Sequence, residues 1–215
     1  SSGKAAPKQQ ARVPRNIMIR AFVVLSLVTI GDGVNFNAGT VSLPKLFEEQ
    51  LNLGSLTTFG VGLTAALVFS FGAMAQLIVG NVIDRLPLRR VFVPIAAIQA
   101  PCFFFAGWAF GWPLLGFTAG VMFALFGQVT INDAMIARYT SDSWRARAFA
   151  VRYVMSFSAS ALAVPLITFF HGRSGNFEAV YTVLAALGAV IFLAALAFPH
   201  RPEEIAPAPA QAAAE

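Results

Sequence analysis

A charge-free run twice the length of a membrane-spanning helix dominates this sequence. It extends over residues 91–132, about 42 residues, and as a helix at 1.5 Å per residue it would measure about 63 Å. A bilayer core is about 30 Å thick and takes about 20 helical residues. The run therefore predicts two crossings, with the bend over residues 107–113 and with Trp108 and Trp112 as interfacial anchors.

Other charge-poor runs predict four more spans. Only Asp32 is charged between Arg20 and Lys45, which contain the first span. The remaining spans are expected over residues 59–83, 153–170 and 179–198. The composition agrees, because 57% of the residues are hydrophobic and 12% are charged, about half the charged fraction of a soluble domain. The sequence thus predicts an all-α integral membrane protein with six transmembrane helices in contact with the lipid bilayer.

The basic residues predict the orientation of these helices. Of the 15 Lys and Arg residues, only Lys45 and Arg173 fall on one side of the predicted spans. The positive-inside rule then places both termini in the cytoplasm. The absence of an N-x-S/T acceptor fits a bacterial protein, and we expect the bacterial inner (plasma) membrane. Residues 1–15 read as a cytoplasmic linker, 16–200 as the six-helix domain, and 201–215, rich in Ala and Pro, as a disordered cytoplasmic tail.

Enzymatic and nucleic-acid functions find no support in the sequence. No zinc-protease, nucleophile-elbow or phosphate-binding motif is present, so we expect no enzyme activity and no cofactor. His171 and His200 fall at opposite membrane faces and cannot share a metal, and Cys102 is alone in an apolar run. The basic residues follow the ends of spans and do not form a face interleaved with aromatics, which argues against nucleic acid.

The loop after the second span resembles a signature of the major facilitator superfamily. Residues 80–90, GNVIDRLPLRR, are similar to the pattern G-x-x-x-D-R/K-x-G-R-R/K, with Pro87 and Leu88 where the family has one Gly. Residues 43–49 and 136–148 resemble the family as well. The resemblance implies a gating loop, in which Asp84 meets a helix of the opposite half and the arginines brace a closed state. The loop residues are Gly80, Asp84, Arg85, Arg89 and Arg90. Alternatively, the arginines only enforce topology.

The resemblance also implies the architecture. Family members have twelve helices in two halves, and four features favour the C-terminal half: the linker-like start, the altered loop, the tail, and the sequence WPLLG at 112–116 where first halves usually have an Arg. The partner would be an N-terminal six-helix half of the same transporter, or a second copy of this chain. The implied function is secondary transport of a small-molecule substrate by alternating access. The alternative is a six-helix membrane scaffold or assembly protein that moves no solute.

Polar residues within the spans are the candidate site. Asp32 lies mid-span, where an ionisable group should face a bundle interior or a water-filled cavity. It shares a helix face with Asn35, Gly39 and Ser42. In the family this helix lines the central cavity, so Asp32 and Asn35 are candidates for a substrate or proton site. The alternative is that local hydroxyls such as Thr29 satisfy Asp32 and that it only joins helices.

The fourth span adds two amides and an acid. Gln128 and Asn132 are four residues apart and share a face, so they either bind substrate in the cavity or join helices by hydrogen bonds. Asp133 lies on another flank, at the same depth as Arg152 when both are counted from the hairpin near Asp142. They either form a buried ion pair, or Arg152 reaches lipid headgroups and Asp133 bonds elsewhere.

Overall fold

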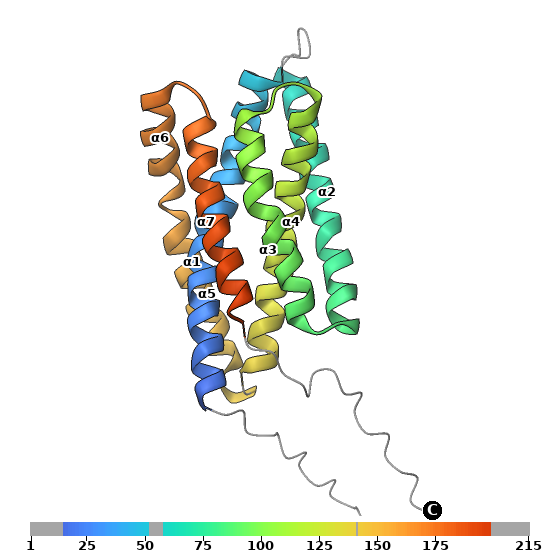
Figure 1. Ribbon diagram of the computed structural model, residues 1–215, viewed down its shortest axis with the longest axis vertical. Helices are drawn as coiled ribbons and strands as arrows, with labels where there is room; N and C mark the ends of the chain where they lie inside the picture. Colours follow the sequence, from blue (N-terminus) through green and yellow to red (C-terminus); the bar gives the residue numbers. More distant parts are fainter. Residues whose placement is uncertain (1–14, 52–57, 141, 199–215) are drawn as a thin grey trace, which may run out of the picture.

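The computed structural model describes residues 15–51, 58–140 and 142–198, which fold into seven α-helices (Figure 1). The predicted linker, apart from Arg15, and the predicted tail lie outside this part of the chain. The helices are α1 (Arg15–Gln50), α2 (Thr58–Arg85), α3 (Leu88–Trp108), α4 (Trp112–Tyr139), α5 (Asp142–Ser160), α6 (Ala163–Ser174) and α7 (Glu178–Leu196).

Five segments of the described chain are long and apolar enough to cross a membrane. They are Phe59–Arg85, Leu88–Trp108, Trp112–Arg138, Ser143–Ser174 and Glu178–Leu196. Helix α1 has 36 residues but is not among them, and it carries Asp32, Asn35 and Asn37 at its centre. The chain is therefore an all-helical membrane protein in its described part, in agreement with the composition.

The predicted bend at residues 107–113 is a tight connection between α3 and α4. Helix α3 ends at Trp108, and Gly111 precedes α4 with φ of 64°, a left-handed conformation that favours glycine. The end of α1 holds this turn, because the Gly111 amide donates to the Gln50 carbonyl at 3.0 Å and the Gln50 side chain donates to the Gly107 carbonyl at 3.1 Å. The long run therefore forms two helices, α3 and α4, each long and apolar enough to cross a membrane.

The segment expected as a fifth span over residues 153–170 is longer and is broken into α5 and α6. The break falls at Ala161 and Leu162, four and three residues before Pro165. Proline has no N–H for the carbonyl of Ala161, and its ring crowds that carbonyl, so the helix cannot continue regularly through this point. Pro94 and Pro101 leave α3 unbroken.

The packing of the helices repeats in two groups, with the broken α5 and α6 counted as one unit. The first group is α1, α2 and α3, and the second is α4, the broken α5 and α6, and α7. Helix α1 packs against α5 and α7, and α4 packs in the corresponding way against α2 and α3. Helices α3 and α7 contact each other, as do α1 and α4. Exchanging the two groups therefore leaves the pattern of helix contacts unchanged, as in a structural repeat.

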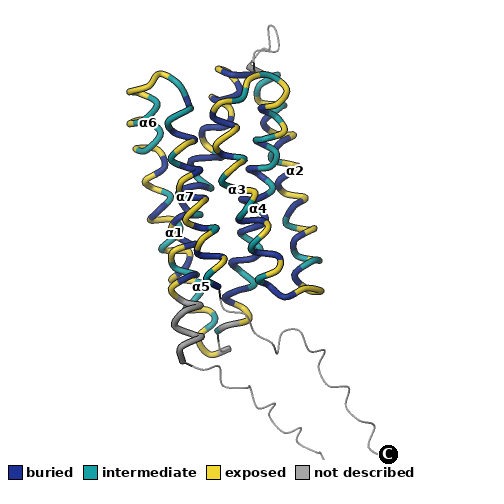
Figure 2. Tube along the Cα trace, in the orientation of Figure 1, coloured by how far each residue is buried: buried dark blue, intermediate teal, exposed yellow. Residues whose placement is uncertain are grey.

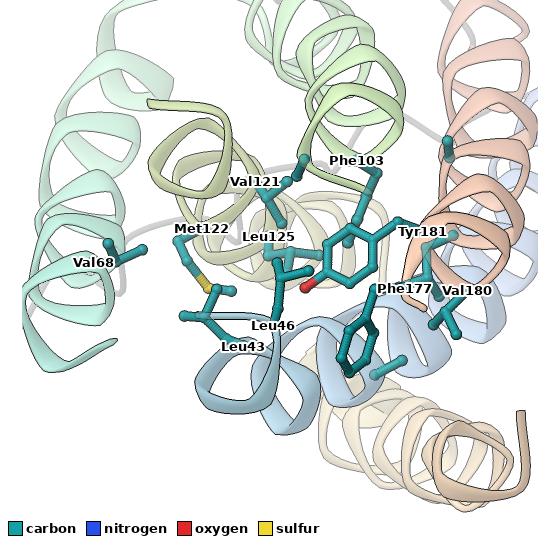
Figure 3. Close-up of a cluster of buried hydrophobic side chains, with 14 of the residues drawn as sticks. Leu43, Leu46, Val68, Phe103, Val121, Met122, Leu125, Phe177, Val180 and Tyr181 are labelled. Atoms are coloured by element: carbon teal, nitrogen blue, oxygen red, sulfur yellow. The ribbon is translucent and has the colours of Figure 1, made fainter. Parts of the chain in front are cut away.

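Two apolar clusters fill the bundle, one near each end. The first includes Leu43, Phe103, Leu125 and Tyr181, whose side chains converge from α1, α3, α4 and α7 (Figure 3). The second is built from the opposite ends of the same helices and includes Phe92 and Phe198. Exposed residues line α2 and α6, at the sides of the molecule (Figure 2). Between the two clusters, the core contains a layer of polar side chains.

Close helix contacts hold α1 and α7 beside this layer. A Cβ at Gly33 would come within 2.5 Å of the Ser156 carbonyl oxygen, so α1 and α5 approach backbone to backbone there. Ser160 donates to the Gly33 carbonyl at 2.9 Å. Gly188 of α7 lies against the backbone of Ala100 in α3. Small residues permit such approaches in membranes, where packing drives helix association.

Candidate functional site

The polar layer is centred on the Asp32 carboxylate. Asp32 lies in the middle of α1, and Asn132 of α4 donates to its Oδ2 at 2.7 Å. The Gln128 amide, one turn earlier in α4, lies 2.5 and 2.9 Å from the two carboxylate oxygens. Gln99 of α3 lies next to Gln128, whose Nε2 donates to its Oε1 at 2.8 Å. Three helices therefore bring three amides around one acid.

Burial distinguishes the members of this group. Gln99, Gln128 and Asn132 are at most 1% exposed, whereas Asp32 is half-buried. Asn132 Oδ1 and Gln99 Nε2 have no hydrogen-bond partner among the described residues. Unpaired amide atoms inside a membrane protein are costly, and these two offer one acceptor and one donor to a water molecule or a polar solute. In the described part of the chain, no group of three His, Cys, Asp or Glu side chains could hold a metal ion.

Arg152 and Asp133 lie beside this group as an ion pair. The Arg152 guanidinium of α5 donates to Asp133 Oδ1 of α4, and it also lies 5.3 Å from the centre of the Tyr153 ring. The Arg152 side chain is 9% exposed and that of Asp133 is 39% exposed. The charges of the layer are thus Asp32, Asp133 and Arg152, with a formal sum of −1 when all are ionised.

The polar residues that share a predicted face of α1 contact two different helices. Asn35 is fully buried and donates to the Leu184 carbonyl of α7 at 3.2 Å, while its Oδ1 has no partner among the described residues. Ser42 lies 3.1 Å from the Tyr181 hydroxyl, also of α7, and donates its own proton to the Ala38 carbonyl at 2.6 Å. Asn35 and Ser42 therefore contact α7, whereas Asp32 contacts α4.

The loop motif forms the connection between α2 and α3. Gly80 and Asp84 lie in the last turns of α2, and Asp84 is exposed with no ion pair to any described residue. Arg85 ends α2, and only Leu86 and Pro87 separate it from α3. Pro87 is the N-cap residue of α3, and its φ of −56° suits the start of a helix. Helix α3 therefore begins directly after this proline.

Arginines at this end of the bundle bind the free carbonyls of helix ends. Arg89 donates to the Leu196 carbonyl of α7 at 2.9 Å, and Arg138 donates to the Ile83 carbonyl of α2 at 2.8 Å. Both interactions suit the negative end of a helix dipole. Arg90 is exposed in the first turn of α3.

Gln99 is the member of the layer that sequence reasoning missed. It contacts Gln128, from which it is separated by 29 residues, and no periodicity within one helix predicts such a pair. A signal was nevertheless present, because Gln99 is a long polar side chain in the middle of a predicted span. The rule that singled out Asp32 applies to any strongly polar group at that depth.

Comparison with known proteins identifies the family of this chain. The family model described as Major Facilitator Superfamily matches residues 20–214, nearly the whole chain. A search of curated proteins gave no match. The family model covers all seven helices except the first residues of α1. The chain therefore belongs to the Major Facilitator Superfamily, a family of membrane transporters.

Proposed function

We propose that this chain is the C-terminal six-helix half of a twelve-helix secondary transporter. Helix α1 would be the first span, because it packs against α4, α5 and α7 as an integral part of the bundle and its 36 residues suffice to cross a bilayer. Within Ser143–Ser174, only 11% of an apolar window of 18 residues is buried, which leaves a large apolar surface for an N-terminal half or a second copy and for lipid. Both termini would lie in the cytoplasm of a bacterial cell.

The observation that carries the transport proposal is the position of Asp32. Its carboxylate lies between the two apolar clusters, and its direct side-chain partners are neutral amides of α4. A charge at such depth is costly and is retained where it serves ion or substrate movement. In alternating-access proteins, the site lies near the bilayer midplane and the two halves rock around it. We propose Asp32, Gln99, Gln128 and Asn132 as the half-site for proton or substrate.

The surroundings of Asp32 support a proton as the coupling ion. The Gln128 amide lies 2.5 and 2.9 Å from the two Asp32 oxygens, and the Asn132 amide donates to one of them. Uncharged amides of this kind accommodate a carboxylate in its ionised or its protonated form, whereas a directly bound cation would keep it ionised. Protonation and rearrangement of the layer would be linked.

The connection between α2 and α3 is a proposed brace for the cytoplasmic-closed state. Asp84 is exposed and has no ion pair with a described residue, so it is available to a helix N-terminus of the other half. Asn35 donates to the Leu184 carbonyl of α7 in this structure, and its Oδ1 has no partner among the described residues. This oxygen would accept a new hydrogen bond when the packing of α1 against α7 changes during transport.

Gradient-driven flux of the full-length protein tests the proposal. The protein would be reconstituted into proteoliposomes and offered a panel of sugars, amino acids, organic acids and organic cations, with and without a pH gradient. We expect uptake or release of at least one class to respond to the gradient. Empty liposomes and protein-free lipid with an ionophore are the controls. No gradient-dependent flux of any solute, by protein shown to be folded, would favour the scaffold function.

A further inference from the structure

A groove at the basic end of the bundle lies between the start of α3 and the end of α7. It has a volume of about 440 Å³, and its lining residues are Arg89, Arg90, Val93, Pro94 and Leu196. The lower ends of α3 and α7 lie side by side in Figure 1, and the Arg89 bond to the Leu196 carbonyl joins them. This groove is separate from the polar layer around Asp32.

The groove combines a basic mouth with an apolar wall. Arg89 and Arg90 belong to the first turn of α3, at the end of the span, where the headgroups of the bilayer lie. Val93 and Pro94 follow one turn deeper, towards the hydrocarbon. A phospholipid matches this order, with its phosphate beside the arginines and an acyl chain along Val93 and Pro94. Free phosphate would contact the arginines alone.

The donors and acceptors at the mouth specify an anion. The described residues that line the groove include two arginines and no acidic residue. Arg89 is fixed by one Nη2 bond to the Leu196 carbonyl and keeps other N–H donors for a phosphate. Pro94 has no N–H, so the carbonyl of Arg90 loses its regular helical partner and remains an acceptor for a headgroup hydroxyl. Basic pockets between transmembrane helices on the cytoplasmic side suit anionic lipid headgroups.

We propose that the groove formed by Arg89, Arg90, Val93, Pro94 and Leu196 is a binding site for an anionic phospholipid of the cytoplasmic leaflet. The lipid would join the ends of α3 and α7, which pack together along the bundle. This role requires no flux through the protein and is independent of the transported solute.

Native mass spectrometry of the full-length protein in detergent tests the proposal. The probes are dioleoylphosphatidylglycerol and, at the same concentration, dioleoylphosphatidylcholine. We expect the wild type to retain one phosphatidylglycerol in preference to phosphatidylcholine. The double variant Arg89→Gln/Arg90→Gln should lose about 25-fold in affinity, since each arginine near an anionic lipid contributes about fivefold. Millimolar inorganic phosphate should not displace the lipid, because it lacks the acyl chain.

Two further variants make the result decisive. Val93→Trp fills the groove but keeps both arginines and the Arg89 bond to α7. We expect this variant to lose the lipid while its thermal unfolding temperature stays that of the wild type. Arg147→Gln removes a charge from the exposed start of α5, on the same membrane side, and should bind as the wild type does. Unchanged lipid binding by Val93→Trp, or an equal loss in Arg147→Gln, would overturn the proposal, as would complete displacement by phosphate.

Discussion

Asp32→Asn is expected to abolish the pH dependence of transport by the full-length protein and to lower the gradient-driven flux about tenfold or more. The substitution keeps the shape of the side chain but removes the charge and the titratable group that Asn132 and Gln128 contact. Hydrogen bonds to charged groups contribute about 1.5–3 kcal/mol each, and 1.4 kcal/mol is a factor of ten. Flux in proteoliposomes at a series of internal and external pH values measures the effect.

Asp84→Asn is the matched control for Asp32→Asn. It makes the same chemical change in an exposed carboxylate at the end of α2. It should alter the rate of conformational exchange without removing the pH dependence. Equal pH profiles for the wild type and Asp32→Asn would assign Asp32 to helix packing alone and would remove the coupling role proposed for it.

Asp133→Asn should lower the free energy of unfolding by about 2 kcal/mol. Removing one partner of a fully buried ion pair costs about 3–5 kcal/mol, and the 39% exposure of the Asp133 side chain reduces that value. The cost arises because Arg152, whose side chain is 9% exposed, would keep its charge without the carboxylate that pairs with it. Denaturant unfolding in mild detergent, followed by tryptophan fluorescence, measures the change.

The reciprocal variant should be less harmful. Arg152→Met leaves Asp133 unpaired but partly solvated, and we expect a loss of about 1 kcal/mol. The double variant Asp133→Asn/Arg152→Met should be more stable than Asp133→Asn, because it leaves no buried charge without its partner. Additive losses in the double variant would show that the ion pair contributes nothing to stability.

The positions of most helices were predictable because their boundaries depend on local properties. Charge-free length and the Gly and Trp residues of the 107–113 segment located the turn between α3 and α4. The break in the fifth span was not predicted, although Pro165 was visible, because proline bends some membrane helices and interrupts others according to their neighbours.

The partners of the polar residues were less predictable, because they depend on which helices meet. Asp32 and Asn35 share a face of α1 by periodicity, yet a helix of 36 residues crosses more than one neighbour, and the two side chains contact α4 and α7 respectively. Gln99 was missed for the same reason. Sequence reasoning identified polar groups at mid-span, and the packing of α3 against α4 brought them together.

Water access to the polar layer from both membrane faces tests the central claim most directly. Val129, half-buried and next to Gln128 in α4, would be replaced by Cys in a Cys102→Ser form of the full-length protein. A membrane-impermeant thiol reagent is added to either side, with a Cys at the exposed Ser174 as the control for reagent and topology. The account predicts labelling of position 129 from each side in turn. Labelling from neither side, while position 174 reacts fully, would contradict it.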